Sequence, residues 1–198
     1  MNQEKSHEVE LRVLLTPEQQ GSLIKQLEGR GAHCVGKEKI VDLYYCPNRT
    51  IDFSQIAMDD VGSCSLRVRS VEQDGVAQVQ LNTKAITTYG DHHAWEEHEV
   101  RVDSAAELQA ILKALGYKVF CLIEKERVKC KLDQMTICID DIRDFGVALE
   151  IEIMANSDTA GKAKQTIKSF LSSLGIGEEQ ILPKSVTYLI MQTKRVSF

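Results

Sequence analysis

Charged side chains alternate with aliphatic ones along several short stretches of this sequence. The first stretch reads Glu8-Val9-Glu10-Leu11-Arg12, and later stretches repeat its period of two residues. Successive side chains of a strand point to opposite faces of a sheet, so each stretch predicts a strand with one charged and one apolar face. The charged members of these stretches are Glu8, Glu10, Arg12, Arg67, Arg69, Lys84, Glu97, Glu99, Lys125, Arg127, Lys129, Lys131, Asp140, Glu150 and Glu152.

The cations and the carboxylates concentrate on different stretches. Cations dominate residues 67–69 and 125–131, whereas carboxylates dominate residues 8–10, 97–99 and 150–152. Guanidinium and ammonium groups bind phosphate oxygens, and carboxylate oxygens are ligands of hard divalent cations such as Mg²⁺ and Mn²⁺. If the two sets share one space, their chemistry suits a polyphosphate held together with divalent cations.

Two arrangements of the charged faces fit this pattern. In the plainer one, an antiparallel sheet has its apolar face inside and its charged face in water. In the other, the sheet closes, turns its apolar face outward to the helices and encloses a water-filled lumen lined by the charges. The expected helices have apolar stripes that need a partner, which favours the closed sheet. A charged lumen also implies a ligand, because each buried ion costs several kcal/mol unless it is compensated.

Four helices are expected in addition to the strands. Thr16 is a helix N-cap, followed by a proline at the first helical position and an acidic first turn. Ser104 and Glu107 form a capping box. Because strands and helices do not alternate strictly, the sequence predicts an α+β fold with antiparallel strands. The helices are expected at residues 16 to 29 or 31, 104–116, 158–174 and 183–192.

Length and composition limit the class of protein and its partners. The chain has 198 residues, 43% of them hydrophobic and 27% charged, which predicts a single globular domain over residues 1–198. Its net charge of −5 argues against a nucleic acid or an anionic membrane as a partner. No stretch reaches the roughly 18 apolar residues of a membrane span, and the first residues lack the apolar core of a signal peptide. A cytoplasmic location is therefore expected.

Several cysteine, histidine and aromatic residues, of types that often take part in catalysis or metal binding, are expected to have a structural role instead. The six cysteines show neither a C-x-x-C pair nor the spacing of metal ligands, so reduced, mostly buried thiols are expected. His92 and His93 are expected to form a solvated pair in a turn. Trp95 and the Tyr44-Tyr45 pair are expected to pack in the core or at its rim. The cysteines are Cys34, Cys46, Cys64, Cys121, Cys130 and Cys138.

The order of the charged stretches resembles a known superfamily. The stretch from Glu8 to Arg12 resembles the E-x-E-x-K signature of the triphosphate tunnel metalloenzymes, also called the CYTH superfamily, and the resemblance spans about residues 7–190. The later stretches, in the family's order, are Asp42-Leu43-Tyr44-Tyr45, Leu66-Arg67-Val68-Arg69, Lys84, Glu97-His98-Glu99, Lys125-Glu126-Arg127, Asp140 and Glu150-Ile151-Glu152. Within the superfamily, Leu115-Gly116-Tyr117 and Ile123-Glu124-Lys125-Glu126-Arg127 look most like the class IV adenylate cyclases.

The resemblance implies a fold, a ligand set and an activity. The implied fold is an eight-stranded antiparallel β-barrel, the triphosphate tunnel, with helices packed outside. The implied cofactor is Mg²⁺ or Mn²⁺, the implied substrate is ATP or another triphosphate, and the class IV subgroup suggests a homodimer. The implied metal ligands are Glu8, Glu10, Glu99 (or Glu97), Asp140, Glu150 and Glu152. The implied phosphate contacts are Arg12, Arg67, Arg69, Lys84, Lys125, Arg127 and Lys184. The implied catalytic groups are Glu10, Arg12, Lys84, Lys125 and Glu150.

The sequence departs from the family pattern at three of these positions. Residue 12 is Arg where the family usually has Lys, and because Arg stays protonated, a general-base role there is excluded. Lys84 is not followed by the usual Gly-Pro, and the family's Ser-Tyr is Ser-Val after Lys184. The arginine at position 12 weakens the case for a hydrolase that activates water more than it weakens the case for a cyclase.

Three functions stay open on the sequence. A class IV-type adenylate cyclase, which we favour, converts ATP to cyclic AMP and pyrophosphate by metal-assisted attack of the ribose 3′-hydroxyl on the α-phosphorus. A triphosphatase would use the same charges while water attacks the γ-phosphorus of inorganic tripolyphosphate or thiamine triphosphate. A non-catalytic binder of nucleotide or polyphosphate has little use for clustered carboxylates, which repel an anion in the absence of metal. The sequence does not say whether Lys129, Lys131 and Lys184 face the tunnel.

Overall fold

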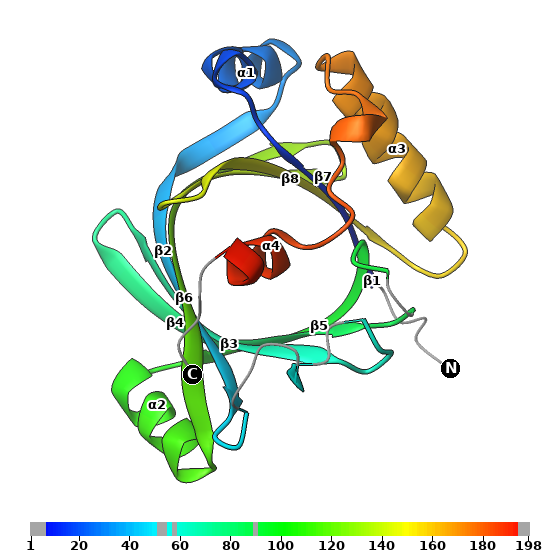
Figure 1. Cartoon of the computed structure of the whole chain (residues 1–198). Helices are drawn as coiled ribbons and strands as arrows, with labels where there is room; N and C mark the ends of the chain where they lie inside the picture. The colour runs from blue at the N-terminus through cyan, green and yellow to red at the C-terminus, as the bar shows by residue number, and fades with distance from the viewer. Residues whose placement is uncertain (1–6, 51–54, 57–58, 89–90, 194–198) are drawn as a thin grey trace, which may run out of the picture.

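Eight antiparallel strands close into a barrel in the computed structural model, which describes residues 7–50, 55–56, 59–88 and 91–193. Around the barrel the strands follow the order β1-β5-β4-β3-β2-β6-β7-β8 (Figure 1). The predicted eight-stranded antiparallel barrel is therefore confirmed. The strands are β1 (His7–Leu14), β2 (His33–Pro47), β3 (Cys64–Gln73), β4 (Val76–Ile86), β5 (Ala94–Val102), β6 (Tyr117–Leu132), β7 (Met135–Ile142) and β8 (Gly146–Ala155).

The helices start from the caps that the sequence contains. The Thr16 hydroxyl accepts the backbone N–H of Gln19 at 3.3 Å, and the Ser104 hydroxyl accepts that of Glu107 at 3.2 Å. The last two helices start a few residues later than expected, because a turn closed by Thr159 precedes one and an extended segment beside β1 precedes the other. No helix of the described ranges is long and apolar enough to cross a membrane. The helices are α1 (Pro17–Gly29), α2 (Ala105–Ala114), α3 (Ala160–Ser173), the 3₁₀ helix η2 (Glu178–Gln180) and α4 (Val186–Thr193).

The barrel packs its apolar face outward against three of these helices. Leu11 of β1 and Leu149 and Ile151 of β8 are at most 1% exposed and form one core with residues of α1 and α3. Helix α2 lies on the opposite side of the barrel (Figure 1). Its Leu108 belongs to a second core cluster with Val68 of β3. The half-solvated sheet is therefore the wrong arrangement, and the charged faces of the strands point into the lumen.

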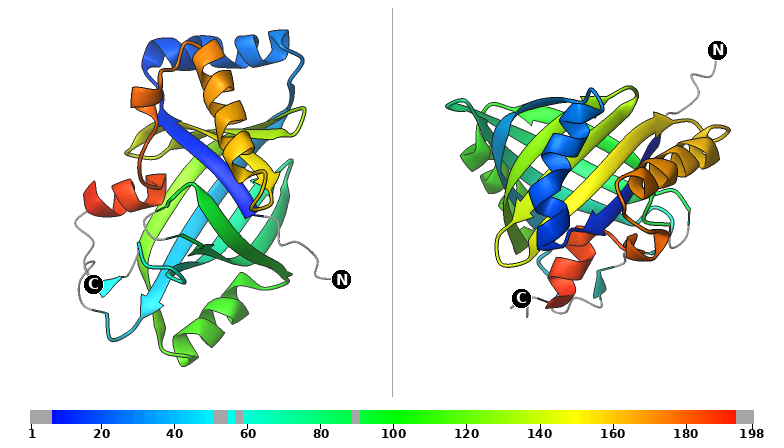
Figure 2. Two further views of the ribbon diagram at one scale, coloured as in Figure 1. Left: turned by 90° about the vertical axis from the view of Figure 1, so that its right-hand side faces the viewer. Right: turned by 90° about the horizontal axis from the view of Figure 1, so that it is seen from above.

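Helix α4 lies across one end of the lumen rather than outside the barrel (Figures 1 and 2). Its residues Ile190 and Met191 are buried against Tyr44 and other apolar side chains of the barrel. The chain reaches this position because the segment before α4 is bound to β1, where the Leu182 N–H donates to the Arg12 carbonyl at 2.8 Å. The expectation that helices pack outside thus holds for α1, α2 and α3 and not for α4.

Two cysteines that were expected to be reduced form a disulfide. Cys34 of β2 and Cys130 of β6 lie directly opposite each other in the strand pairing and are bonded. The 96 residues that separate them in the sequence gave no sign of this proximity, which exists because β2 pairs with β6. The prediction of six reduced thiols is wrong for this pair and correct for Cys46, Cys64, Cys121 and Cys138, which form no disulfide.

The outward-facing core should dominate the stability of the barrel. Ile151→Ala, at a fully buried position, is expected to lower the free energy of unfolding by about 2–5 kcal/mol, because it leaves a cavity between β8 and the helices. Urea denaturation followed by circular dichroism measures this change. Met154→Ala on the same strand, at a side chain 63% exposed, serves as the control and should change stability by less than about 0.5 kcal/mol. Equal effects of the two substitutions would contradict the packing described here.

Candidate active site

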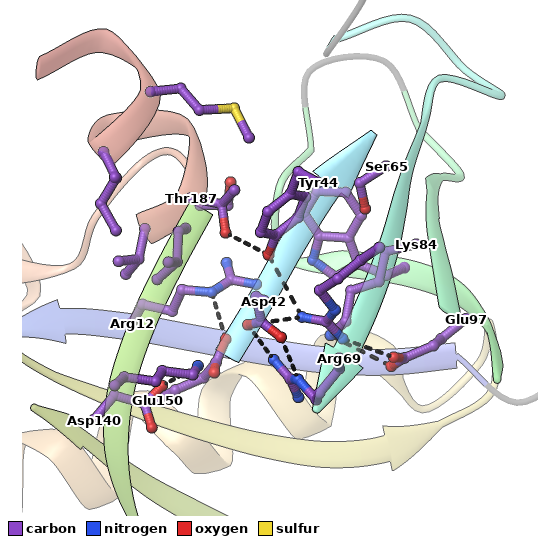
Figure 3. Close-up of a pocket in the computed structure, with 18 of the residues that line it drawn as sticks. Arg12, Asp42, Tyr44, Ser65, Arg69, Lys84, Glu97, Asp140, Glu150 and Thr187 are labelled. Carbon is purple, nitrogen blue, oxygen red and sulfur yellow. Dashed lines mark hydrogen bonds and ion pairs between the residues drawn. The ribbon is translucent and has the colours of Figure 1, made fainter. Parts of the chain in front are cut away.

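A cavity of about 270 Å³ lies inside the barrel and collects the charged faces of its strands (Figure 3). Among the described residues, seven cations and seven carboxylates line it. Of the predicted site residues, Glu10 and Lys184 stand apart from this lining. The cations are Arg12, Arg67, Arg69, Lys84, Lys125, Arg127 and Lys129, and the carboxylates are Glu8, Asp42, Glu97, Glu99, Asp140, Glu150 and Glu152.

The strand register decides which of these charges meet. The pairing of β1 with β8 places Glu10 opposite Glu152 and Arg12 opposite Glu150. Directly opposed side chains on one face of a sheet lie within about 5.5 Å of each other at their Cβ atoms. Residues far apart in the sequence are therefore brought into direct electrostatic contact.

Arg12 is the centre of the first group of charges. Its Nε donates to Glu150 Oε1 at 2.7 Å, its second terminal nitrogen forms an ion pair with Glu10, and its Nη1 donates to the His92 carbonyl oxygen at 2.8 Å. Arg127 also contacts Glu150, at 3.3 Å. Burial opposes the ionisation of Glu150, but Arg12 and Arg127 outweigh it and hold the pKa of that carboxyl below its usual range. Glu150 is therefore an ionised partner of two guanidinium groups.

Asp42 is the centre of a second group that the sequence did not assign. Arg69 donates to both oxygens of Asp42, at 2.7 and 2.8 Å (Figure 3). Arg67 approaches Asp42 to 3.8 Å. Arg67 in turn donates to Asn82 at 2.8 Å. Burial works against the charge of Asp42, but the two arginines keep its pKa below the usual range. One feature of the sequence could have indicated this role. Asp42 lies two residues before Tyr44, so the two side chains point to the same face of β2, and both line the cavity.

Asp140 holds the third group of charges. Lys125 donates to one of its oxygens at 2.6 Å, and Arg127 donates to both, at 2.6 and 2.7 Å. Burial, together with the neighbouring Arg127, lowers the pKa of Lys125. Asp140 was expected as a metal ligand, yet in this structure its two oxygens bind the cations of β6.

Three carboxylates form a cluster that fits a divalent cation. One oxygen from each of Glu8, Glu10 and Glu152 lies within 4.8 Å of the others. Glu10 is fully buried, and its charge is balanced by the ion pair with Arg12 and by Lys84 at 3.6 Å, which also contacts Glu8. Burial, then Glu150 and Glu8, raise the pKa of Glu152 to about 7. A bound Mg²⁺ or Mn²⁺ would relieve the mutual repulsion of these neighbouring carboxylates, so the residues present fit such an ion.

The remaining predicted site residues have clear positions. Glu99 accepts the Asn82 amide at 3.3 Å, and Glu97 lies 3.4 Å from Lys84. Lys129 lines the cavity, whereas Lys131 contacts Thr136 near the exposed end of β6. Lys184 contacts Asp59 rather than the cavity. Of the expected metal ligands, the structure thus brings Glu8, Glu10 and Glu152 together, while Asp140, Glu150 and Glu99 bind protein donors.

His92 differs from its expected solvated position. Its side chain is fully buried, and its Nε2 lies 2.7 Å from Asp59 Oδ1. The ring also packs edge-on against Trp95 and Tyr188, with centroids 5.5 and 5.9 Å away. The prediction failed because Asp59 and Tyr188 come from two distant segments that the fold brings to His92.

A closed antiparallel barrel whose lumen gathers cations beside a carboxylate cluster is the architecture of the triphosphate tunnel proteins. The CYTH domain family model matches residues 6–186, and the chain belongs to this family. The resemblance drawn from the sequence is thereby confirmed.

Proteins that resemble this chain in sequence or fold include one named as a putative cyclase and one described with a triphosphatase activity. “Putative adenylate cyclase MJ0240” from Methanocaldococcus jannaschii is 26% identical over 179 residues, covering 90% of this chain and 95% of that protein. The PH1819 protein from Pyrococcus horikoshii superposes with a TM-score of 0.79 at 23% identity, covering 94% of this chain and 99% of the other. HpAC1 from Hippeastrum, described as a putative adenylyl cyclase with a dominant triphosphatase activity, superposes with a TM-score of 0.68 at 15% identity, covering 97% and 98%.

Asp42 should stabilise the fold through the two arginines that it neutralises. Asp42→Asn is expected to lower the free energy of unfolding by about 3–5 kcal/mol, because it leaves buried guanidinium charge without its counter-charge. The folded pKa of Asp42 lies below the unfolded one, so its ionised form stabilises the protein above the unfolded pKa and loses this effect as the pH falls through the folded pKa. The difference between wild type and variant should therefore stay constant from about pH 8 to about pH 5 and shrink below about pH 4.

Urea denaturation at each pH measures this difference. Glu126→Gln is the matched control, because Glu126 pairs at 3.2 Å with Lys37 on the exposed surface. Its effect should stay below about 1 kcal/mol. A similarly small effect of Asp42→Asn would show that Asp42 is not the counter-charge of these arginines.

Proposed function

We propose that the protein is a divalent-metal-dependent enzyme that acts on a nucleoside triphosphate, and that its reaction is that of a class IV-type adenylate cyclase, ATP to cyclic AMP and pyrophosphate. One observation carries the proposal: the cations share one cavity with Glu8 and Glu152, which form a carboxylate cluster with the buried Glu10 behind them. The name of the relative from Methanocaldococcus jannaschii supports the same reaction.

The charge balance of the cavity supports a metal requirement. Cations and carboxylates line it in equal numbers, so the described lumen offers little net positive charge to a triphosphate. A divalent cation at the carboxylate cluster would supply positive charge, polarise the phosphate oxygens and lower the pKa of an attacking hydroxyl. Mg²⁺ and Mn²⁺ both suit ligands of this type.

The cations of the chain bind and orient the phosphates. Arg67 and Arg69 on β3 and Lys125 and Arg127 on β6 flank β2 from its two sides and present their donors to the same cavity. Guanidinium groups donate two parallel hydrogen bonds to a phosphate, which fixes its orientation as well as its position. Arg12 stays protonated throughout and neutralises negative charge on the departing pyrophosphate.

The cavity also has an apolar end, under α4, that suits the nucleoside. Ile190 and Met191 of α4 line it together with Tyr44, Phe120 and Ile142 of the barrel. An apolar and aromatic wall contributes little to binding an inorganic polyphosphate, whereas it can pack against a base and exclude water. The exclusion of water favours attack by the ribose hydroxyl over hydrolysis.

A triphosphatase is the second candidate. The activity described for HpAC1, which shares the fold, supports it. The same cations would hold the triphosphate, and water would attack the γ-phosphorus in place of the ribose hydroxyl at the α-phosphorus. The two reactions differ in where the triphosphate lies along the cavity.

Product analysis separates the two reactions. Purified protein is incubated with ATP and Mg²⁺ or Mn²⁺, and in parallel with tripolyphosphate or thiamine triphosphate, and the products are separated by chromatography. Cyclic AMP with pyrophosphate is the expected result. Release of ADP or phosphate without cyclic AMP would contradict the cyclase and support the triphosphatase.

Two substitutions link the activity to the proposed residues. Glu10→Ala and Glu150→Ala are each expected to reduce metal-dependent turnover by more than about 100-fold. This loss would exceed the roughly 10- to 100-fold typical of residues that only position a metal ligand. Glu124→Ala is the matched control, because Glu124 pairs with Arg143 on the outer surface. Full activity of both cavity variants would refute the assignment of the site.

A further inference from the structure

His92 lies where three segments outside the barrel strands meet. Its Nε2 is 2.7 Å from Asp59 Oδ1, and the Lys184 ammonium contacts the same carboxylate oxygen. Lys184 Nζ also lies 5.5 Å from the ring centroid of Tyr188 in α4. Asp59, His92 and Lys184, which we call the His92 cluster, thus connect the residues before β3, the residues before β5 and the start of α4.

The main chain of His92 contacts the charged lumen. Its carbonyl oxygen accepts a hydrogen bond from Arg12 Nη1 at 2.8 Å, and both groups are buried. The next residue, His93, accepts the Glu10 backbone N–H at 3.0 Å. From the other side, the Leu182 N–H donates to the Arg12 carbonyl at 2.8 Å. Arg12 is therefore held by the segment that contains His92 and by the segment that leads to Lys184.

The His92 side chain is suited to a fixed hydrogen bond. It is fully buried, and burial lowers its pKa, so the ring is neutral and carries one proton. Its Nδ1 has no hydrogen-bond partner in the described part of the chain, whereas Nε2 faces the Asp59 carboxylate. The proton therefore belongs on Nε2, where it is donated to Asp59. The Lys184 ammonium contacts the same oxygen of Asp59 and balances its charge, and it lies 3.3 Å from His92 Nε2, farther than the carboxylate at 2.7 Å.

We propose that His92 is a positioning residue: its bond to Asp59 fixes the His92 carbonyl, and this carbonyl holds the Arg12 guanidinium between Glu10 and Glu150. Lys184 then anchors α4 to the cluster and does not contact phosphate. This inference rests on the proposed function, since Arg12 is assigned to the site on that basis. Without the cluster, Arg12 keeps its carboxylate partners and loses the acceptor that sets its direction.

Loss of the cluster should reduce turnover more than substrate binding. His92→Leu and Asp59→Ala are each expected to lower kcat by about 10- to 100-fold, the range typical of residues that orient a catalytic group. The KM should change little, because Arg67, Arg69, Lys125 and Arg127 still bind phosphate. His92→Gln, whose amide places an N–H near the position of Nε2, should restore most of the lost kcat. The double variant of His92→Leu and Asp59→Ala should be no worse than either single one, because both remove the same bond.

Asp59→Ala tests the proposal independently of His92→Leu, and an exposed carboxylate provides the control. Asp59 has a side chain 41% exposed, so its substitution leaves the core intact even if His92→Leu fails to fold. Glu178→Ala is the matched control, because it removes an exposed carboxylate that pairs with Lys168, and its kcat should equal that of the wild type. A wild-type kcat for Asp59→Ala, or a His92→Gln variant as impaired as His92→Leu, would overturn the proposal.

A second readout separates this proposal from the proposed function. Trp95 is the only tryptophan of the chain, is 8% exposed, and lies 5.5 Å from the His92 ring and 5.9 Å from the Arg12 guanidinium carbon. If the wild type turns over no triphosphate, the proposed function fails and Trp95 fluorescence still decides the role of the cluster. Asp59→Ala should then shift the emission to the red and increase acrylamide quenching relative to Glu178→Ala. Identical spectra of these two variants would overturn the proposal.

Discussion

The register of the antiparallel pairs is the constraint on which the rest of the structure depends. Side chains alternate strictly along each strand, so a shift of one residue would move the charges of that strand into the outer core. The pairing of β1 with β8 avoids this and sets Arg12 opposite Glu150. The same alternation places Leu11 and Ile151 outside, under α1 and α3. One choice of register therefore builds both the core and the lumen.

Pairs of opposite charges offset the free-energy cost of burying so many ions in the lumen. Asp42 pairs with Arg67 and Arg69, and Asp140 pairs with Lys125 and Arg127. These carboxylates also fix the directions of the cations, so their donors already point into the cavity. Donors that are oriented before a phosphate arrives need little rearrangement to bind it, which is the usual source of electrostatic catalysis.

Much of the fold and part of the site could be predicted from the alternation of charged and apolar residues. Side chains alternate between the two faces of a strand, and this local rule alone separated the inward Arg67 and Arg69 from the outward Val68. The partners of each charge could not be predicted in this way. Asp42, the Cys34–Cys130 disulfide and the buried His92 all depend on contacts between distant segments, which a single sequence does not display. The same reason explains why α4 was expected outside the barrel.

The equal numbers of cations and carboxylates in the cavity have a thermodynamic consequence. Arg69 and Arg127 each direct at least two of their five N–H donors to a carboxylate, so a phosphate would share these cations with Asp42 and Asp140. In the proposed enzyme a triphosphate would add negative charge to this balanced lumen, and a divalent cation would offset it. Any increase in triphosphate affinity caused by the metal would be matched by the same increase in metal affinity, as reciprocal linkage requires. On the proposed function, the barrel would therefore bind the metal complex of its substrate better than either component alone.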